Sequence, residues 1–294
     1  MKACVFAHYD ADRLLDDYLK PYLTELAGLF SRIIFVSTSG VDPAGLSFLS
    51  GLGIEVIARE NDGYDFQSYK VGIERLLTEG ESWDSLLIAN DSCYGPLFPL
   101  REVFSAMEGS ASDFWGMTRC DNPKPHIQSY FVLFEKKAVE AEAFRKFWAE
   151  MRPLSSRQEV IEAYEIGLSA KLGEAGLGMG CYLKTKGARN PSLTRPRSLL
   201  RRRVPLMKIS LLKDNPWGAN ISNIEAEISE RSAYSFTAIL KHLARITKKD
   251  SSEVGQYLKK NGFRASVRHW LRVKRERYLP LSPSKTGLGK EPRI

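Results

Sequence analysis

The amino-terminal third of the sequence alternates between short apolar runs and longer amphipathic runs, and this alternation limits the fold more than any other feature. Runs rich in Val, Ile, Leu and Phe favour buried strands, whereas the segments between them have the apolar spacing of helices. Strands separated by helices of this length usually form a parallel sheet covered on both faces. The predicted strands are 2–9, 32–38, 54–59 and 85–91, and the predicted helices are 12–29 (interrupted at Pro21), 43–52 and 67–79. We therefore expect an α/β fold.

The middle of the chain extends this pattern. Two further strands are predicted at 113–118 and 126–135, and two further helices are predicted at 137–151 and 157–176. In the first of these helices, Phe144, Phe147 and Trp148 share one apolar face, which predicts packing against the core. The second helix ends at Gly176, a residue type suited to helix C-caps.

Composition argues against several classes of protein. No apolar run of 18 residues exists and the start of the sequence lacks the layout of a signal peptide, so we expect a cytoplasmic protein that does not span a membrane. Cys4, Cys93, Cys120 and Cys181 are widely spaced without a C-x-x-C pair, which favours simple packing over zinc binding or disulfides. No Gly-rich phosphate loop follows the first strand, which argues against dehydrogenases and P-loop NTPases.

The charge of the chain is unevenly distributed. Residues 1–183 carry a formal charge of −10, whereas residues 184–294 carry +18. The segment 184–208 combines Pro and Ser with a dense set of basic residues, which predicts a linker or extended arm. We therefore expect a domain boundary near 184, with an α/β domain before it and a basic, mainly helical region after it.

The basic region leaves two interpretations open. Short amphipathic helices are predicted at 233–246 and 252–263, and a disordered tail is predicted from about 280. The excess of Lys and Arg suits peripheral contact with the anionic inner face of a bacterial membrane. The alternative is a solvated charged surface. Nucleic-acid binding is not expected, because the aromatic residues form neither a stacking platform nor a known module.

Polar side chains close three of the predicted strands. In parallel sheets, ligands bind beyond the carboxyl ends of the strands, because loop amides and helix N-termini converge there. The segments are "AHYD" (7–10), "RENDGYD" (59–65) and "ANDS" (89–92). The candidate donor-binding residues in them are His8, Asp10, Arg59, Asn61, Gly63, Asp65, Asn90 and Ser92.

Asp91 stands at the end of a buried run, between Asn90 and Ser92. It resembles the D-x-D element of glycosyltransferases with the GT-A fold, in which a carboxylate reaches a sugar nucleotide and often a Mg²⁺ or Mn²⁺ ion. A hard cation held by carboxylate oxygens neutralises the charge of a departing diphosphate. Only one of the two acids is present here. The alternative is that Asp91 and Ser92 cap the following turn.

The loop "RENDGYDF" (59–66) resembles the E-N-x-G segment that lies beside the nucleotide in many GT-A enzymes. Gly63 would let the backbone approach a ligand closely, and Asn61 and Asp65 would supply polar contacts. The alternative is an ordinary turn, because Asn-Asp-Gly is common in turns.

The segment "YEIGLSAKLGEAG" (164–176) resembles the E-D-x-x-L-x-x-R-L-x-x-x-G helix of inverting GT-A transferases. Tyr164 and Glu165 occupy the place of the acidic pair, which makes Glu165 the candidate catalytic base. An acceptor hydroxyl becomes a good nucleophile when a carboxylate within hydrogen-bond reach removes its proton. The alternative is a glutamate on a solvated helix face.

The segment "KPHIQSYF" supplies candidate acceptor-binding residues. In the predicted strand 126–135, the alternation of side chains places His126, Gln128 and Tyr130 on the same face, where they suit hydrogen bonds to sugar hydroxyls. Two alternatives remain. One is a hydrogen-bonded histidine beside ordinary sheet residues, and the other is a metal site that His126 completes with Asp91.

Four of these segments together resemble the rhamnan synthesis protein F (RgpF) family, and the resemblance covers about residues 2–220, including "RVPLMKISLLKDNP" (203–216). The resemblance implies a GT-A-like mixed sheet flanked by helices. It also implies an enzyme that moves a deoxyhexose, typically rhamnose, from a nucleotide-sugar donor to a lipid-linked glycan acceptor. The resemblances to GT-A motifs make Glu165 and Asp91 the candidate catalytic residues. The alternative is a non-catalytic scaffold that anchors a polysaccharide-assembly complex.

Overall fold

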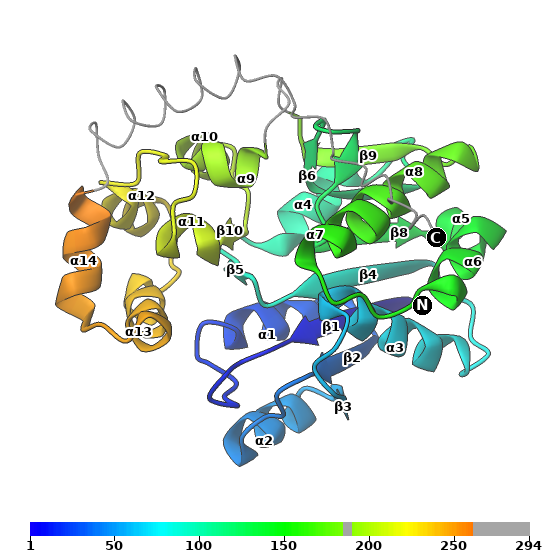
Figure 1. Cartoon of the computed structure of the whole chain (residues 1–294), viewed down its shortest axis with the longest axis horizontal. Coiled ribbons are helices and arrows are strands. Elements are labelled where there is room, and N and C mark those ends of the chain that lie inside the picture. Colours follow the sequence, from blue (N-terminus) through cyan, green and yellow to red (C-terminus); the bar gives the residue numbers. More distant parts are fainter. Residues whose placement is uncertain (185–189, 261–294) are drawn as a thin grey trace, which may run out of the picture.

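The computed structural model describes residues 1–184 and 190–260. Its strands are β1 (Lys2–His8), β2 (Arg32–Ser37), β3 (Glu55–Ala58), β4 (Ser85–Asn90), β5 (Cys93–Tyr94), β6 (Phe114–Cys120), β7 (His126–Ile127), β8 (Phe131–Glu135), β9 (Met179–Leu183) and β10 (Met207–Lys208). The main sheet has the order β3-β2-β1-β4-β8-β6-β7, with β9 paired to β6 (Figure 1). The first four strands in this order are parallel, whereas β8 is antiparallel to both β4 and β6. The predicted class, a mixed α/β sheet flanked by helices, is confirmed.

Helices cover both faces of this sheet (Figure 1). They are α1 (Lys20–Leu29), α2 (Pro43–Gly51), α3 (Tyr64–Leu77), α4 (Leu100–Met107), α5 (Lys136–Glu140), α6 (Glu142–Glu150), α7 (Arg157–Val160), a π-helix (Ile161–Ile166), α8 (Gly167–Glu174), α9 (Pro191–Thr194), α10 (Pro196–Arg201), α11 (Ile209–Lys213), α12 (Ile224–Arg231), α13 (Phe236–Thr247) and α14 (Ser251–Lys260). Within the described residues, no helix is both long enough and apolar enough to cross a bilayer.

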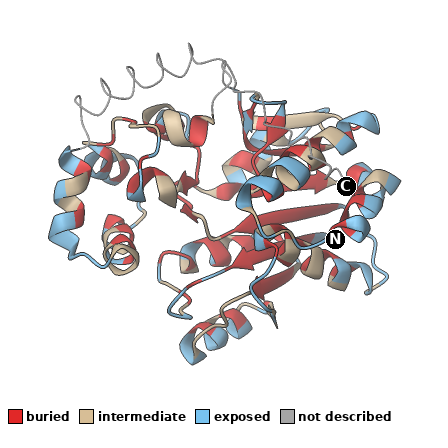
Figure 2. Ribbon diagram, in the orientation of Figure 1, coloured by how far each residue is buried: buried red, intermediate tan, exposed pale blue. Residues whose placement is uncertain are grey.

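The central strands are buried on both faces, which explains their nearly continuous apolar sequences (Figure 2). Along β1, Cys4 and Phe6 belong to the core beneath α1 and α4, whereas Val5 belongs to the core beneath α3 and α6. The second core requires close contact between helix and strand. A Cβ atom on Gly72 of α3 would lie 2.3 Å from a methyl carbon of Val5, so glycine is needed at that position.

The first helix is shorter than predicted. Helix α1 begins at Lys20, with Pro21 in its first turn, and the residues before it form turns. Carboxylates of this region accept hydrogen bonds from backbone N–H groups there: Asp10 from Leu14 and Asp42 from Leu15. These bonds stabilise a turn in competition with a helix, which explains the difference.

The predicted strand 126–135 is interrupted. Residues 126–127 pair with β6, and the sheet resumes at Phe131. The prediction that His126, Gln128 and Tyr130 share one face of a continuous strand is therefore wrong. The bend is held by side-chain hydrogen bonds described below.

Two predicted helices are divided. The segment 137–151 forms α5 and α6 with a break at Ala141, and its three aromatic residues are buried as predicted. The segment 157–176 forms α7, a π-helical turn and α8, and Gly176 follows with a φ of +78°. A single π-helical turn within an α-helix often marks a functional site.

The described part of the basic region is packed rather than extended. Leu199, Leu200, Val204 and Leu206 are buried where a linker was expected, and Leu200 and Leu206 join the core that contains α1. The amphipathic helices predicted at 233–246 and 252–263 correspond to α13 and α14 as far as residue 260. The remainder of the second helix and the tail predicted from about 280 lie outside the described residues.

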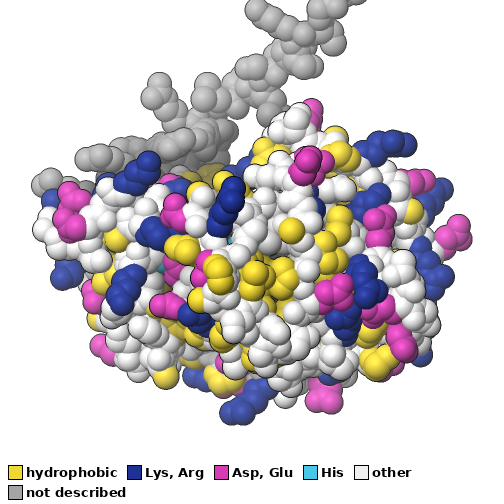
Figure 3. Space-filling model, turned by 90° about the horizontal axis from the view of Figure 1, so that it is seen from below, with side chains coloured by type: hydrophobic (Ala, Val, Ile, Leu, Met, Phe, Trp, Pro, Cys, Tyr) yellow, Lys and Arg dark blue, Asp and Glu magenta, His cyan; other side chains and the backbone are white. Residues whose placement is uncertain are grey.

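Ion pairs join the two oppositely charged halves of the chain. Arg203 pairs with Glu102 at 2.7 Å, and Arg245 of α13 pairs with Asp10 at the end of β1. Helices α9 to α14 lie together at the end of the molecule opposite α5 and α6 (Figure 1). On the face seen in Figure 3, basic side chains are interspersed with acidic ones, so the charge asymmetry in sequence does not divide that face into two patches.

Candidate active site

A cavity of about 300 Å³ lies at the carboxyl end of β4. It brings together five of the residues predicted from sequence, although they belong to four separate segments: Asp65, Asn90, Ser92, Gln128 and Glu165. We call it the Glu165 cavity. The other residues that line it are Tyr64, Phe66, Ser129, Arg157, Val160, Ile161, Asn190, Leu193, Lys208 and Ser210.

Glu165 lies on the π-helical turn, with 17% of its side chain exposed. Its Oε2 accepts two hydrogen bonds from Ser129, one from the backbone N–H at 2.9 Å and one from the hydroxyl at 2.5 Å. Its Oε1 lies 3.9 Å from His126 Nε2. A carboxylate fixed in this way at the wall of a cavity is suited to act as a general base.

A hydrogen-bonded chain of polar side chains follows the end of β4. The Asn90 amide donates to Asp65 Oδ2 at 2.7 Å, and Asn90 Oδ1 accepts from the hydroxyl of Ser92 at 2.5 Å. Asp65 lies in the first turn of α3, so that helix supplies one carboxylate to the wall of the cavity. Burial raises the pKa of the Asp65 carboxyl.

Asp91 is next to these residues in sequence but does not line the Glu165 cavity. Its Oδ2 accepts a hydrogen bond of 2.6 Å from the backbone N–H of Tyr9. Burial, together with the negative charges of Asp65 and Asp10, raises the pKa of Asp91 to about 8, against the lowering effect of the Tyr9 bond. Asp91 therefore lies close enough to Asp65 for the two carboxylates to repel each other.

Lys208 enters the cavity from the carboxy-terminal region and was not predicted as a site residue. Strand β10 pairs with β5, which begins two residues after Asp91, and this pairing brings Lys208 opposite Cys93. Its Nζ donates to the hydroxyl of Ser92 at 2.9 Å and lies 4.4 Å from the ring centre of Tyr130. The sequence feature that could have indicated Lys208 is the segment 203–216, which contains this lysine and is part of the family resemblance described for the sequence.

The candidate acceptor residues have different environments. Gln128 lines the cavity, but its Oε1 accepts bonds from the hydroxyls of Thr118 at 2.6 Å and Ser192 at 3.0 Å. Tyr130 is buried in the same network, 3.0 Å from Ser192 Oγ. His126 is buried, with Nδ1 2.7 Å from the carbonyl of Lys124. The structure therefore brings Gln128 to the cavity, whereas Tyr130 and His126 support its wall.

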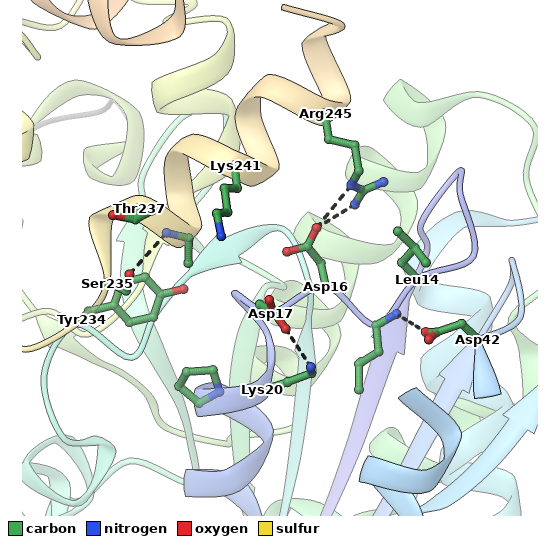
Figure 4. Close-up of a pocket in the computed structure, with 13 residues that line it drawn as sticks. Leu14, Asp16, Asp17, Lys20, Asp42, Tyr234, Ser235, Thr237, Lys241 and Arg245 are labelled. Carbon is green, nitrogen blue, oxygen red and sulfur yellow. Dashed lines mark hydrogen bonds and ion pairs between the residues drawn. The ribbon is translucent and has the colours of Figure 1, made fainter. Parts of the chain in front are cut away.

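Two predicted donor-binding residues at the end of β1 are engaged within the protein. His8 is buried with Nδ1 3.0 Å from the hydroxyl of Ser37, and burial lowers its pKa to about 4. Asp10 forms an ion pair with Arg245. Arg245 also pairs with Asp16 at 3.0 Å (Figure 4). Burial raises the pKa of Asp10, but its bonds to Arg245 and to backbone N–H groups outweigh that effect and lower it.

The ion pair between Arg245 and Asp16 borders a separate cavity of about 580 Å³ between α13 and the turn after β1 (Figure 4). Lys241 projects toward it from α13, and Asp16, Asp17 and Asp42 line it from the amino-terminal half. None of the residues predicted as site residues lines this cavity.

Arg59 holds the loop after β3 together. It donates from Nε to the hydroxyl of Ser68 at 3.0 Å, from Nη1 to the carbonyl of Asp62 at 2.8 Å, and from Nη2 to the carbonyl of Tyr64 at 2.7 Å. It also forms an ion pair with the Asp62 carboxylate at 2.6 Å. Its guanidinium group is therefore occupied by the protein itself.

Asn61 and Gly63 line a different cavity, of about 530 Å³, which we call the Pro153 cavity. It lies between the loop after β3 and the segment before α7, and its residues are Asn61, Asp62, Gly63, Tyr64, Pro153, Leu154 and Ser155. Tyr64 lines both this cavity and the Glu165 cavity. A Cβ atom on Gly63 would lie 3.0 Å from Pro153 Cα, so this glycine allows two loops to approach each other.

The residues present suit a divalent cation that a ligand brings with it rather than a resident metal. In the described part of the chain, no group of three or more His, Cys, Asp or Glu side chains could hold a metal ion. Mg²⁺ commonly binds through one or two carboxylates together with substrate phosphates. Burial is the largest cause of the raised pKa of both Asp91 and Asp65, and the charge of Asp65 contributes to the raised pKa of Asp91, so a cation beside them would favour their charged forms.

A family model described as rhamnan synthesis protein F matches residues 33–271. Virulence protein VirA of Vibrio anguillarum is 30% identical over 199 residues, and the match covers 55% of this chain and 63% of VirA. The chain thus spans less than two thirds of the length of this curated relative.

Solved structures with low similarity were also found. One is a cytidylyltransferase from Leptospira borgpetersenii, with a TM-score of 0.41, 10% identity, and coverage of 84% of this chain and 95% of that one. Another is glucosyl-3-phosphoglycerate synthase from Mycobacterium tuberculosis, with a TM-score of 0.39, 11% identity, and coverage of 73% and 78%. The family assignment rests on the family model.

Proposed function

Because the chain belongs to the rhamnan synthesis protein F family, we propose that it is a glycosyltransferase that moves a deoxyhexose, namely rhamnose, from a nucleotide-sugar donor to a growing bacterial cell-surface polysaccharide. One observation carries this proposal. The Glu165 cavity joins a fixed carboxylate to Asp65, Asn90 and Lys208 at the end of a parallel sheet, where α/β proteins bind ligands.

In this proposal Glu165 is the base of an inverting transfer. It accepts the proton of the acceptor hydroxyl while that oxygen forms a bond to the anomeric carbon of the donor sugar. The bond from that carbon to the phosphate oxygen breaks, and its electron pair leaves with the nucleoside diphosphate. The two bonds from Ser129 hold one Glu165 oxygen, so the carboxylate is oriented before the acceptor binds.

The leaving diphosphate would lie on the opposite wall of the cavity. Lys208 and Arg157 line that cavity, and a cationic side chain near the leaving oxygen stabilises the charge that develops there. Asp65, which lines the cavity, would hold a Mg²⁺ or Mn²⁺ ion that arrives with the diphosphate, and Asp91, which does not line the cavity, would add a second negative charge nearby. When bound, the ion would neutralise part of the diphosphate charge.

The acceptor is proposed to be a lipid-linked glycan at the inner face of the bacterial membrane. The excess positive charge of residues 184–294 supports peripheral contact with anionic lipids, because each Lys or Arg near such a surface contributes about 1 kcal/mol. Exposed Arg201 and Arg202 are among the described residues that supply this charge. Co-sedimentation of the protein with anionic and with neutral lipid vesicles tests this contact. We expect the protein to bind the anionic vesicles and not the neutral ones.

A non-catalytic scaffold is the second candidate function. It is favoured by the engagement of Asp10 with Arg245 and of Arg59 with its own loop, because neither side chain is then available to a nucleotide. A scaffold of this kind would retain the fold and the contacts with partners but would not turn over a donor.

Binding of nucleotide sugars separates the two candidates. A ligand that binds only the folded state raises the melting temperature by mass action. We expect a nucleotide-activated rhamnose, with Mg²⁺ or Mn²⁺, to raise it and to be transferred to a rhamnose-terminated acceptor. A panel of nucleotide sugars that neither stabilises the protein nor is turned over would contradict the transferase and favour the scaffold.

A further inference from the structure

The Glu165 and Pro153 cavities share one side chain. Tyr64 lines both of them, and it is among the large apolar side chains left exposed, at 44%. Its hydroxyl donates to the carbonyl of Ser155 at 3.2 Å, which fixes the ring across the boundary between the loop after β3 and the segment before α7. A ligand that extends out of the Glu165 cavity along this ring would enter the Pro153 cavity.

The backbone of Tyr64 is in a costly conformation. Its φ is +57°, and that of Gly63 before it is +61°. In the left-handed region, the Cβ atom of a residue other than glycine crowds the following carbonyl oxygen. The contacts of Arg59 with the carbonyls of Tyr64 and Asp62 hold this conformation. Strain that the surrounding structure maintains is a feature of ligand-binding sites.

The charge of the Pro153 cavity distinguishes its ligand from the donor. Lys208 and Arg157 line the Glu165 cavity, whereas the described residues that line the Pro153 cavity include no lysine or arginine. Its single acid, Asp62, is already paired with Arg59. This cavity therefore suits a neutral ligand and offers no cationic side chain to a diphosphate.

The chemistry of the lining suits carbohydrate. A pyranose ring has an apolar C–H face and a rim of hydroxyl groups, and an exposed tyrosine offers a flat apolar surface of matching shape. Asn61 and Ser155 are exposed and supply polar side chains beside it. The volume of about 530 Å³ is within the usual range for small-molecule sites.

We propose that the Pro153 cavity binds the glycan acceptor behind its reacting end, with Tyr64 as the surface on which a sugar ring stacks. The proposal rests on the proposed function, because that function places the reacting end of the glycan beside Glu165. It assigns Asn61 and Gly63 to acceptor binding instead of donor binding. A chain of at least two sugar residues would span from one cavity to the other.

The test compares direct binding of a rhamnose trisaccharide and of methyl rhamnoside, measured by NMR titration without donor. We expect the trisaccharide to bind at least tenfold more tightly to the wild type. Tyr64→Gly removes the ring and relieves the positive φ, so it should fold, and the preference should fall to about twofold or less. Tyr64→Phe retains the ring and should retain the preference. Melting temperatures of both variants report folding.

Two results would overturn the proposal. One is equal affinity of the wild type for the two sugars, and the other is an undiminished preference in folded Tyr64→Gly. Nucleotide-sugar binding by the same protein separates this inference from the proposed function. If a nucleotide sugar binds but the trisaccharide binds no more tightly than methyl rhamnoside, the proposed transferase function is retained and the acceptor site is rejected. If the trisaccharide binds through Tyr64 but no nucleotide sugar binds, the glycan site is retained and the proposed transferase function is rejected.

Discussion

Ser129 donates both its backbone N–H and its hydroxyl to Oε2 of Glu165, at 2.9 and 2.5 Å. Ser129 lies in the bend between β7 and β8, and Glu165 lies on the π-helical turn, so the pair connects the sheet to the helix that carries the proposed base. The bend that interrupts the predicted strand thus has a function in this account. It places two donors where a carboxylate needs to be oriented.

Ser129→Ala removes one of these two donors. We expect kcat to fall roughly tenfold to a hundredfold because the base loses its orientation, while the Kd of the donor changes little. Ser129→Thr keeps both donors and should recover most of the activity. Steady-state kinetics together with donor titration check this. A change in donor Kd without a change in kcat would show that Ser129 serves the donor instead.

Lys208→Ala removes a cation from the Glu165 cavity. Charge-assisted hydrogen bonds contribute about 1.5–3 kcal/mol, so affinity for a nucleoside diphosphate should fall roughly 10- to 100-fold. Lys213→Ala is the matched control, because Lys213 is exposed on the neighbouring α11. Calorimetric titration measures both. Equal affinities of the two variants would remove Lys208 from the diphosphate site.

Asp91→Asn should change how stability depends on pH. Burial and the charges of Asp65 and Asp10 raise the pKa of Asp91 from 3.8 to about 8 in the folded state. Between these pH values the folded state binds one more proton than the unfolded state, so the stability of the ligand-free protein falls as pH rises. The side chain in the Asp91→Asn variant does not ionise, so the variant avoids this loss of stability. Its amide oxygen still accepts a hydrogen bond from the Tyr9 N–H.

The measurement is the melting temperature of both proteins from pH 4 to pH 8.5 in the presence of a chelator. We expect the Asp91→Asn variant and the wild type to melt alike near pH 4, and the variant to melt several degrees higher near pH 8. Parallel curves over the whole range would mean that Asp91 titrates normally.

Arg245→Ala should destabilise the fold. Arg245 is only 23% exposed and pairs with Asp10 and Asp16, so its removal leaves a mostly buried carboxylate without its cation. We expect a loss of about 2 kcal/mol in the free energy of unfolding at pH 7, measured with urea. Lys241→Ala, at an exposed position of α13, should change it by less than about 0.5 kcal/mol.

The pH dependence provides a second check on this pair. The pKa of Asp10 is lowered in the folded state from 3.8, so its contribution is complete above that pH and is lost as pH falls through the lowered value. The difference between wild type and Arg245→Ala should therefore shrink below pH 4. A difference that stays constant would show that Arg245 stabilises the protein through packing alone.

The sheet was predictable because the signals for it are local. The apolar runs that became β1 and β4 are bounded by polar residues, and their observed ends lie within two residues of the predicted ones. The burial of Phe144 and Trp148 likewise follows from spacing on a helix. These features depend on residues that are neighbours in sequence.

The use of individual polar side chains was not predictable in the same way. Asp10 has the residue type and position of a ligand, but its partner Arg245 is 235 residues away. Lys208 lies in a two-residue strand within a basic, Pro-containing segment, and only its pairing with β5 brings it to Ser92. Long-range pairing decides which candidates face a cavity and which hold the fold together.

The central claim is that Glu165 acts as the base in a cavity that also holds the donor. Kinetics and donor binding of Glu165→Gln test it most directly, with Glu162→Gln as control, because Glu162 lies exposed on the same π-helical turn. We expect Glu165→Gln to bind the nucleotide sugar within about threefold of wild type but to transfer it at least roughly a hundredfold more slowly, with Glu162→Gln unchanged. Transfer by Glu165→Gln at the wild-type rate would contradict the account.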